Sequence, residues 1–182
     1  MDFRRPMDNY YQDSEFQEKI IQVSRVSKKT KGGNKIGFSV LVVVGDRKGQ
    51  VGVGLGKSPE VQSSIKKAVT YAKKHLITVP MNGTTIPHPV NIKLGAAKIM
   101  LKPASPGTGV IAGGAVRAVT EAAGIHDILS KVLGTSNKAS NVYATLAALK
   151  SLRPVEDLKI RRGKKLGEQD RKSQKDKVEV KE

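Results

Sequence analysis

The chain has 182 residues, of which 38% are hydrophobic, enough for one or two domains with a buried core rather than a disordered tail. Its 33 Lys and Arg against 16 Asp and Glu give a formal charge of +17, which points to a polyanionic partner, either nucleic acid or an acidic membrane surface. The absence of Cys excludes disulfide scaffolds, Cys-ligated zinc and Cys nucleophiles.

The excess charge is concentrated in the part of the chain expected to fold. Residues 1–18 carry a net −3 and residues 159–182 a net +5, so residues 19–158 hold +15. With only 4% aromatic residues and no Trp, a platform of exposed rings that stack bases is poorly supported. We expect contacts with phosphates, sugars and the shape of the RNA instead.

No segment has the pattern of a membrane protein. The first residues lack the apolar stretch of a signal peptide, and the longest strongly apolar run, residues 38–44, is too short to cross a bilayer. We therefore expect a soluble cytoplasmic protein with no membrane partner.

The first strands follow from the N-terminal pattern. Residues 1–15 are polar and turn-rich and are expected to form a flexible arm. Alternating β-branched and polar residues over 19–27 predict a strand, and 28–34 (KKTKGGN) reads as a basic turn. Residues 36–44 (IGFSVLVVV) give the strongest strand signal, and 45–49 (GDRKG) predicts a hairpin turn.

A third strand follows from Val51, where apolar residues alternate with glycines at Gly52, Gly54 and Gly56. One face of this strand is therefore apolar and the other carries no side chains. The bare face fits either a close approach by another element or a twisted or bulged edge.

A helix is predicted directly after this strand. Ser58 is a candidate N-cap, and Pro59 suits the first helical position. Apolar residues recur at helical spacing on the side expected to face the sheet: Val61, Ile65, Ala68, Ala72 and Leu76. The opposite side is basic. The first unit, residues 16–79, therefore reads β-β-β-α.

The second unit is expected over residues 90–162, after a linker over 80–89 that holds three prolines. The pattern predicts strands over 90–94 and 97–102, a loop over 103–109, and helices over 112–123 and 138–152. It leaves 125–133 open between strand and helix. A short helix has room after Pro154, and 163–182 is expected to be a disordered charged tail. The predicted fold class is α+β.

One glycine-rich motif resembles a P-loop. Residues 52–58 (GVGLGKS) are one residue short of that motif, because Val51 stands where its first glycine is needed. We favour a contact of Lys57 and Ser58 with an RNA phosphate at the helix N-terminus.

A second motif, residues 107–112 (GTGVIA), matches the dinucleotide-binding pattern, with Asp127 twenty positions after Gly107. The fit is weak because two prolines separate the glycines from the preceding strand and no βαβ repeat follows. Either the glycines let a helix pack closely on a sheet, or their amides contact RNA backbone beside Lys102 and Arg117.

No catalytic constellation is apparent. His75, His88 and His126 are scattered without metal spacing, and the acidic pair at 156–157 would not share a helix face. The sequence predicts a binding protein without cofactor, metal or small-molecule substrate, not an enzyme.

Eight short sequence motifs resemble, in their order and spacing, those of the family of the fifth protein of the bacterial small ribosomal subunit. They are RVSK at 25–28, KGG at 31–33, VVGD at 43–46, GQVGVGLGK at 49–57, IKKA at 65–68, PASPGTGVIAGGAVR at 103–117, AGIHD at 123–127 and GTSN at 134–137. The match runs from about Phe16 to Arg162.

This resemblance implies an N-terminal domain related to the double-stranded-RNA-binding fold and a C-terminal β/α domain typical of the family. It also implies binding to small-subunit (16S) rRNA where the head joins the body, beside the fourth and eighth small-subunit proteins. Family members are associated with decoding accuracy, the mRNA entry region, and spectinomycin sensitivity through the loop that is 28–33 here. The alternative is a free-standing double-stranded-RNA-binding regulator or ribosome assembly factor.

Residues from both predicted units are expected to contact RNA. They are Arg25, Lys28, Lys29, Lys31, Gly32, Gly33, Lys35, Lys57, Ser58, Lys66, Lys67, Lys73, Lys74, Lys102, Gly107, Gly109 and Arg117. The family often has Arg where this chain has Asn34 and Tyr143, so no ionic contact is expected at either position.

Overall fold

The structure, a computed structural model, describes residues 16–155. Residues 16–152 fall in one compact unit, and a second unit begins at Arg153. The predicted arm, the charged tail, the short helix after Pro154 and the acidic pair at 156–157 lie outside the described residues or at their border.

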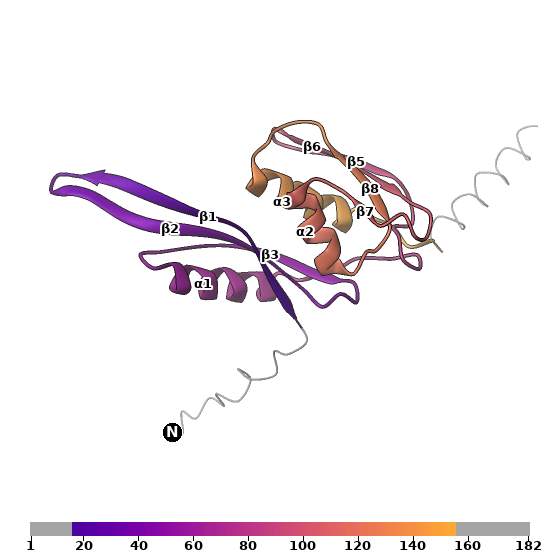
Figure 1. The fold of residues 1–182 in the computed structure, drawn as a ribbon, viewed down its shortest axis with the longest axis horizontal. Helices are drawn as coiled ribbons and strands as arrows, with labels where there is room; N and C mark the ends of the chain where they lie inside the picture. Colours follow the sequence, from indigo (N-terminus) through magenta and orange to yellow (C-terminus); the bar gives the residue numbers. More distant parts are fainter. Residues whose placement is uncertain (1–15, 156–182) are drawn as a thin grey trace, which may run out of the picture. The chain divides into compact units, whose positions relative to one another are not determined.

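The first sheet contains the strands β1 (Gln17–Thr30), β2 (Gly33–Gly45), β3 (Gln50–Ser58) and β4 (Ile77–Thr78), antiparallel and in that order. Helix α1 (Val61–Lys74) connects β3 to β4 and lies along β2 and β3 (Figure 1). The predicted β-β-β-α order is confirmed. The short β4 was not anticipated.

The basic segment at 28–34 is mostly strand, not turn. Lys28 pairs with Lys35 and Lys29 with Asn34, so the turn itself is only Lys31 and Gly32. β3 pairs with β2 no further than Phe38, which leaves the end of the β1–β2 hairpin as a two-stranded ribbon. The basic residues of this segment therefore lie in paired strands at the tip of the hairpin.

Helix α1 packs directly on the backbone of β3. A Cβ added at Gly52, Gly54 or Gly56 would overlap a carbonyl oxygen of α1, and the carbonyls met are those of Ala72, Ala68 and Ser64 in turn. Each contact moves two residues along the strand and four along the helix, which are steps of about 6.7 and 6.0 Å. Of the two interpretations of this bare face, the close approach is the one observed.

The predicted start of the helix is wrong. Ser58 pairs with Phe38 in the β2–β3 ladder, so its backbone belongs to the strand and Pro59 also precedes the helix. Glu60 is the N-cap, and its backbone carbonyl accepts hydrogen bonds from the amide and hydroxyl of Ser64 at 3.1 and 2.8 Å. Continued strand pairing displaces the cap that the sequence suggested.

The second sheet has the order β5-β6-β8-β7. Its strands are β5 (Val90–Leu94), β6 (Ala97–Pro103), β7 (Val110–Ile111) and β8 (Ile128–Val132), and only β7 with β8 is parallel. The segment left open over 125–133 contains the strand β8. Helix α2 (Gly114–Ala123) ends at Gly124, in the left-handed conformation expected of this C-cap, and α3 (Lys138–Lys150) is capped by the Asn137 side chain.

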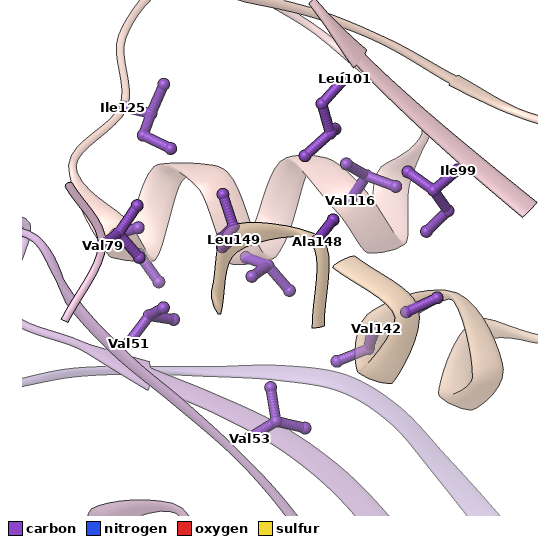
Figure 2. Packing of buried hydrophobic residues seen from close by; sticks show 14 of the residues in the cluster. Val51, Val53, Val79, Ile99, Leu101, Val116, Ile125, Val142, Ala148 and Leu149 are labelled. Atoms are coloured by element: carbon purple, nitrogen blue, oxygen red, sulfur yellow. The ribbon is translucent and has the colours of Figure 1, made fainter. Parts of the chain in front are cut away.

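One hydrophobic core joins the elements of both sheets. Figure 2 shows Val51 and Val53 of β3 on one side of Leu149 of α3, with Ile99 and Leu101 of β6 on the other, all at most 2% exposed. Val40, Val42 and Val44 of β2 pack against α1 in a smaller cluster. The first sheet is thus buried on both faces, and the α+β class predicted from the sequence is confirmed.

Candidate nucleic-acid interface

The β1–β2 hairpin displays the densest group of predicted contacts. Its basic side chains are all exposed: Arg25, Lys28, Lys29, Lys31 and Lys35. Lys28 and Lys35 are direct cross-strand neighbours, and like charges in such positions repel. A polyanion bound along the ribbon would relieve this repulsion.

The turn of this hairpin depends on its glycines. Gly33 has a φ of 126°, which side chains rarely adopt, and its carbonyl accepts a 2.7 Å hydrogen bond from the Thr30 hydroxyl. Nothing lies within 4 Å of a Cβ added at Gly32. The predicted Gly32 and Gly33 therefore lie at an open backbone surface between Lys31 and Lys35.

Lys57 joins the hairpin rather than the helix. It lies in β3 opposite Ser39 and lines a groove of about 390 Å³ together with Lys28 and Lys35. Apolar side chains, among them Val26 and Phe38, form part of the wall. Lys57 therefore stays a predicted RNA contact but not one at the helix N-terminus, since it lies in β3, three residues before the N-cap Glu60.

The basic side of α1 is only partly as predicted. Lys66, Lys67 and Lys74 are exposed, and together with Tyr71 they line a hollow of about 350 Å³. Lys73 instead points to the other flank of the helix, where its Nζ lies 3.5 Å from a carboxylate oxygen of Glu18. The helix Val61–Lys74 contains no acidic residue, so the hollow is surrounded by positive charge.

The loop around Gly107 and Gly109 is closed by an acidic side chain. The backbone amide of Gly109 donates to Asp127 Oδ1 at 2.9 Å, so this amide is engaged within the protein. Hydrogen bonds from the Thr84 hydroxyl, and then from the amides of Gly109 and Gly107, lower the pKa of Asp127 below its ordinary value. A carboxylate held on the glycines opposes a pyrophosphate there, which argues against a dinucleotide site.

The Arg117 side chain is 54% exposed, but its guanidinium also contacts groups of the protein itself. Its Nη2 donates to the carbonyl of Val110 at 2.9 Å, and its Nε lies 3.4 Å from a carboxylate oxygen of Glu121. Lys102 lies apart from it, exposed on the outer face of β6. The structure therefore separates the predicted contacts into the hairpin with Lys57, the α1 face, and the second sheet.

The outer face of the second sheet holds three lysines that were not predicted from the sequence, beside Lys102, which was. Register places exposed lysines on this face in three neighbouring strands: Lys93, Lys98, Lys102 and Lys131. Large exposed apolar residues lie beside them, with Ile111 54% and Leu129 37% exposed. Period-two alternation over 98–102 was the signal that could have found this face.

The predictions against catalysis and membrane insertion can be compared with the described residues. Among residues 16–155 no group of three His, Asp or Glu side chains could hold a metal ion. Within the same range, no helix is long and apolar enough to span a bilayer. The P-loop-like residues 52–58 form strand β3 beneath α1, so they form no phosphate-binding loop.

Comparison with known proteins covers most of the chain. A family model described as ribosomal protein S5, N-terminal domain, matches residues 16–80, and one described as ribosomal protein S5, C-terminal domain, matches residues 92–162. The small ribosomal subunit protein uS5 of Nocardia farcinica (strain IFM 10152) is 55% identical over 146 residues. That alignment spans 80% of this chain and 67% of the relative.

Proposed function

Because the chain belongs to the ribosomal protein S5 family, we propose that its basic hairpin, with Lys57, binds folded rRNA of the small subunit through phosphate contacts. As a family member the chain is a structural constituent of the small ribosomal subunit, not an enzyme, and its location is the cytoplasmic ribosome.

The observation that carries the proposal is the convergence of positive charge at the hairpin. Lys28 and Lys35, adjacent across the ladder, share a groove with Lys57 from another strand. A groove between strands that carries three lysines and no acidic side chain suits a phosphate backbone, since such contacts fix position without reading sequence. Its apolar wall suits the sugar and base edges next to those phosphates.

The finer functions are proposed on the family resemblance. We place the chain where the head joins the body, beside the fourth and eighth small-subunit proteins and near the mRNA entry region, with a role in translational accuracy. The outer face of the second sheet supports a protein neighbour, since its lysines are interleaved with large exposed apolar residues. A stably integrated chain is expected to co-sediment with small subunits after a high-salt wash.

Salt dependence tests the hairpin directly. Affinity for RNA falls as salt rises, and Lys28→Gln combined with Lys35→Gln should make this dependence less steep. The magnitude of the slope of log affinity against log salt should decrease by about two, because two phosphate contacts are lost. The measurement is binding of full-length protein to small-subunit rRNA at several salt concentrations. Removing the Lys28–Lys35 repulsion should leave the hairpin folded, which circular dichroism can check.

Lys150→Gln is the control, since Lys150 is exposed at the end of α3, away from the hairpin. Its slope should equal that of the unmodified chain. An unchanged slope in the double variant, or an equal loss per charge in the control, would contradict the assignment.

A further inference from the structure

An exposed aromatic pair lies on the basic helix. Tyr71 is 47% exposed, and its ring stacks on that of His75 one turn later, with centroids 4.2 Å apart and planes inclined by 27°. The composition had argued against base stacking because aromatic residues are few. Local geometry gives a different result, since one well-placed ring is sufficient for one base.

The pair is held in a fixed arrangement. His75 Nδ1 lies 2.9 Å from the carbonyl oxygen of Tyr71, and because a carbonyl only accepts, Nδ1 carries the hydrogen in this contact. The imidazole therefore supports one side of the Tyr71 ring. The remaining exposed surface of Tyr71 faces the hollow that Lys66, Lys67, Thr70 and Lys74 also line.

The composition of the hollow identifies the ligand. It is an open depression of about 350 Å³ on one side of α1, and three of its five lining residues are lysines. A ring beside several cations matches a nucleotide, whose base stacks while its phosphates meet the cations. An apolar peptide or an acyl chain would instead leave the lysines without counter-charges.

We propose that this hollow binds one unpaired nucleotide of an RNA strand, with the base stacked on Tyr71 and the flanking phosphates on Lys67 and Lys74. Bases inside a duplex are already stacked on each other, so only a bulged, looped or terminal nucleotide can use the ring. The inference extends the proposed RNA-binding function and depends on it.

The absence of Trp allows a direct test. Tyr71→Trp makes residue 71 the sole indole, whose fluorescence reports stacking. Single-stranded oligouridylate should quench this fluorescence, whereas inorganic polyphosphate, which has charge but no bases, should not. Leu94→Trp, at a position 46% exposed on the face of the second sheet opposite to that of Lys93, is the matched control and should respond to neither. Lack of quenching by oligouridylate at saturation, or equal quenching by polyphosphate, would overturn the proposal.

Affinity provides an independent readout. Tyr71→Ala should weaken binding of oligouridylate about fivefold or more with an unchanged salt slope, and Tyr71→Phe should retain binding. Lys67→Gln should instead lower the slope by about one. If Tyr71→Ala leaves the affinity unchanged, the stacking site is wrong.

The hairpin variant separates this failure from failure of the proposed function. If Lys28→Gln with Lys35→Gln still makes the salt dependence of rRNA binding less steep while Tyr71→Ala leaves the affinity for oligouridylate unchanged, rRNA binding by the hairpin is supported. Only the stacking site is then wrong. Where neither variant alters binding to rRNA, both proposals fall.

Discussion

At the scale of single residues, Asp127 shows how a motif can mislead. Its distance from Gly107 matches the dinucleotide-binding pattern, yet its carboxylate accepts a hydrogen bond from the Gly109 amide of the glycine loop itself, and the residue is only 4% exposed. Spacing along the chain could not reveal this, because the segment after α2 turns back toward the loop. Asp127 therefore holds the backbone of the glycine loop in place instead of binding a ligand.

Asp127 should also make stability depend on pH. Because hydrogen bonds lower its pKa in the folded state, its contribution is fully present above the unfolded value, about 3.9, and is lost as pH falls through the folded value. The difference in unfolding free energy between the unmodified chain and Asp127→Asn should be constant from about pH 5 to 7 and shrink below about pH 4. Denaturant unfolding at several pH values measures it; a constant difference down to pH 2 would contradict the assignment.

At the scale of elements, local patterns predicted most of the fold. Alternation identified β1 and β3, the apolar run over 36–44 identified β2, and Gly124 marked the end of α2. The errors lie where pairing with another strand determines the secondary structure of a residue. Lys28 and Lys29 extend β1 because they pair with β2, and Ser58 is held in β3 by Phe38. Neither preference is visible in a local window.

The contact of α1 with β3 predicts a strongly position-dependent effect of the same substitution. Gly54→Ala should lower the free energy of unfolding by about 1–3 kcal/mol or more, because the added methyl meets the carbonyl of Ala68. Gly114→Ala, in the first turn of α2 with nothing within 4 Å of the added Cβ, should leave it unchanged or raise it by up to about 1 kcal/mol. Urea unfolding compares the two, and equal effects would refute the close packing.

At the scale of the whole molecule, the sequence predicted some features of the linker and of the candidate site but not others. Residues 80–89 were predicted to separate two domains, and that division remains a prediction, yet Ile86 is 1% exposed within a core shared by both sheets. The lysines of the hairpin and of α1 were identified by charge alone. Tyr71 and the outer face of the second sheet were missed, since their meaning depends on neighbours brought together by folding.

The shared core predicts coupled unfolding of both sheets. Leu149→Ala should lower the free energy of unfolding by about 2–5 kcal/mol, because Leu149 is fully buried in that core. Amide hydrogen exchange should speed up in β3 as well as in β6, since both strands contribute to the cluster. Leu133→Ala, at a side chain 61% exposed, should change neither. Faster exchange confined to β6 would show that the two sheets open independently.

The glycines of β3 have a consequence for the entropy of binding. Since α1 is seated on backbone atoms at three successive points, it cannot slide or rotate without collision, and its lysines occupy preset positions. Ordering RNA on this helix therefore costs mainly side-chain freedom, about 0.5–1.5 kcal/mol for each immobilised chain. The hairpin tip is supported by only two strands and must also lose backbone freedom. RNA that fits α1 is thus selected by a rigid template, whereas at the hairpin both molecules adjust.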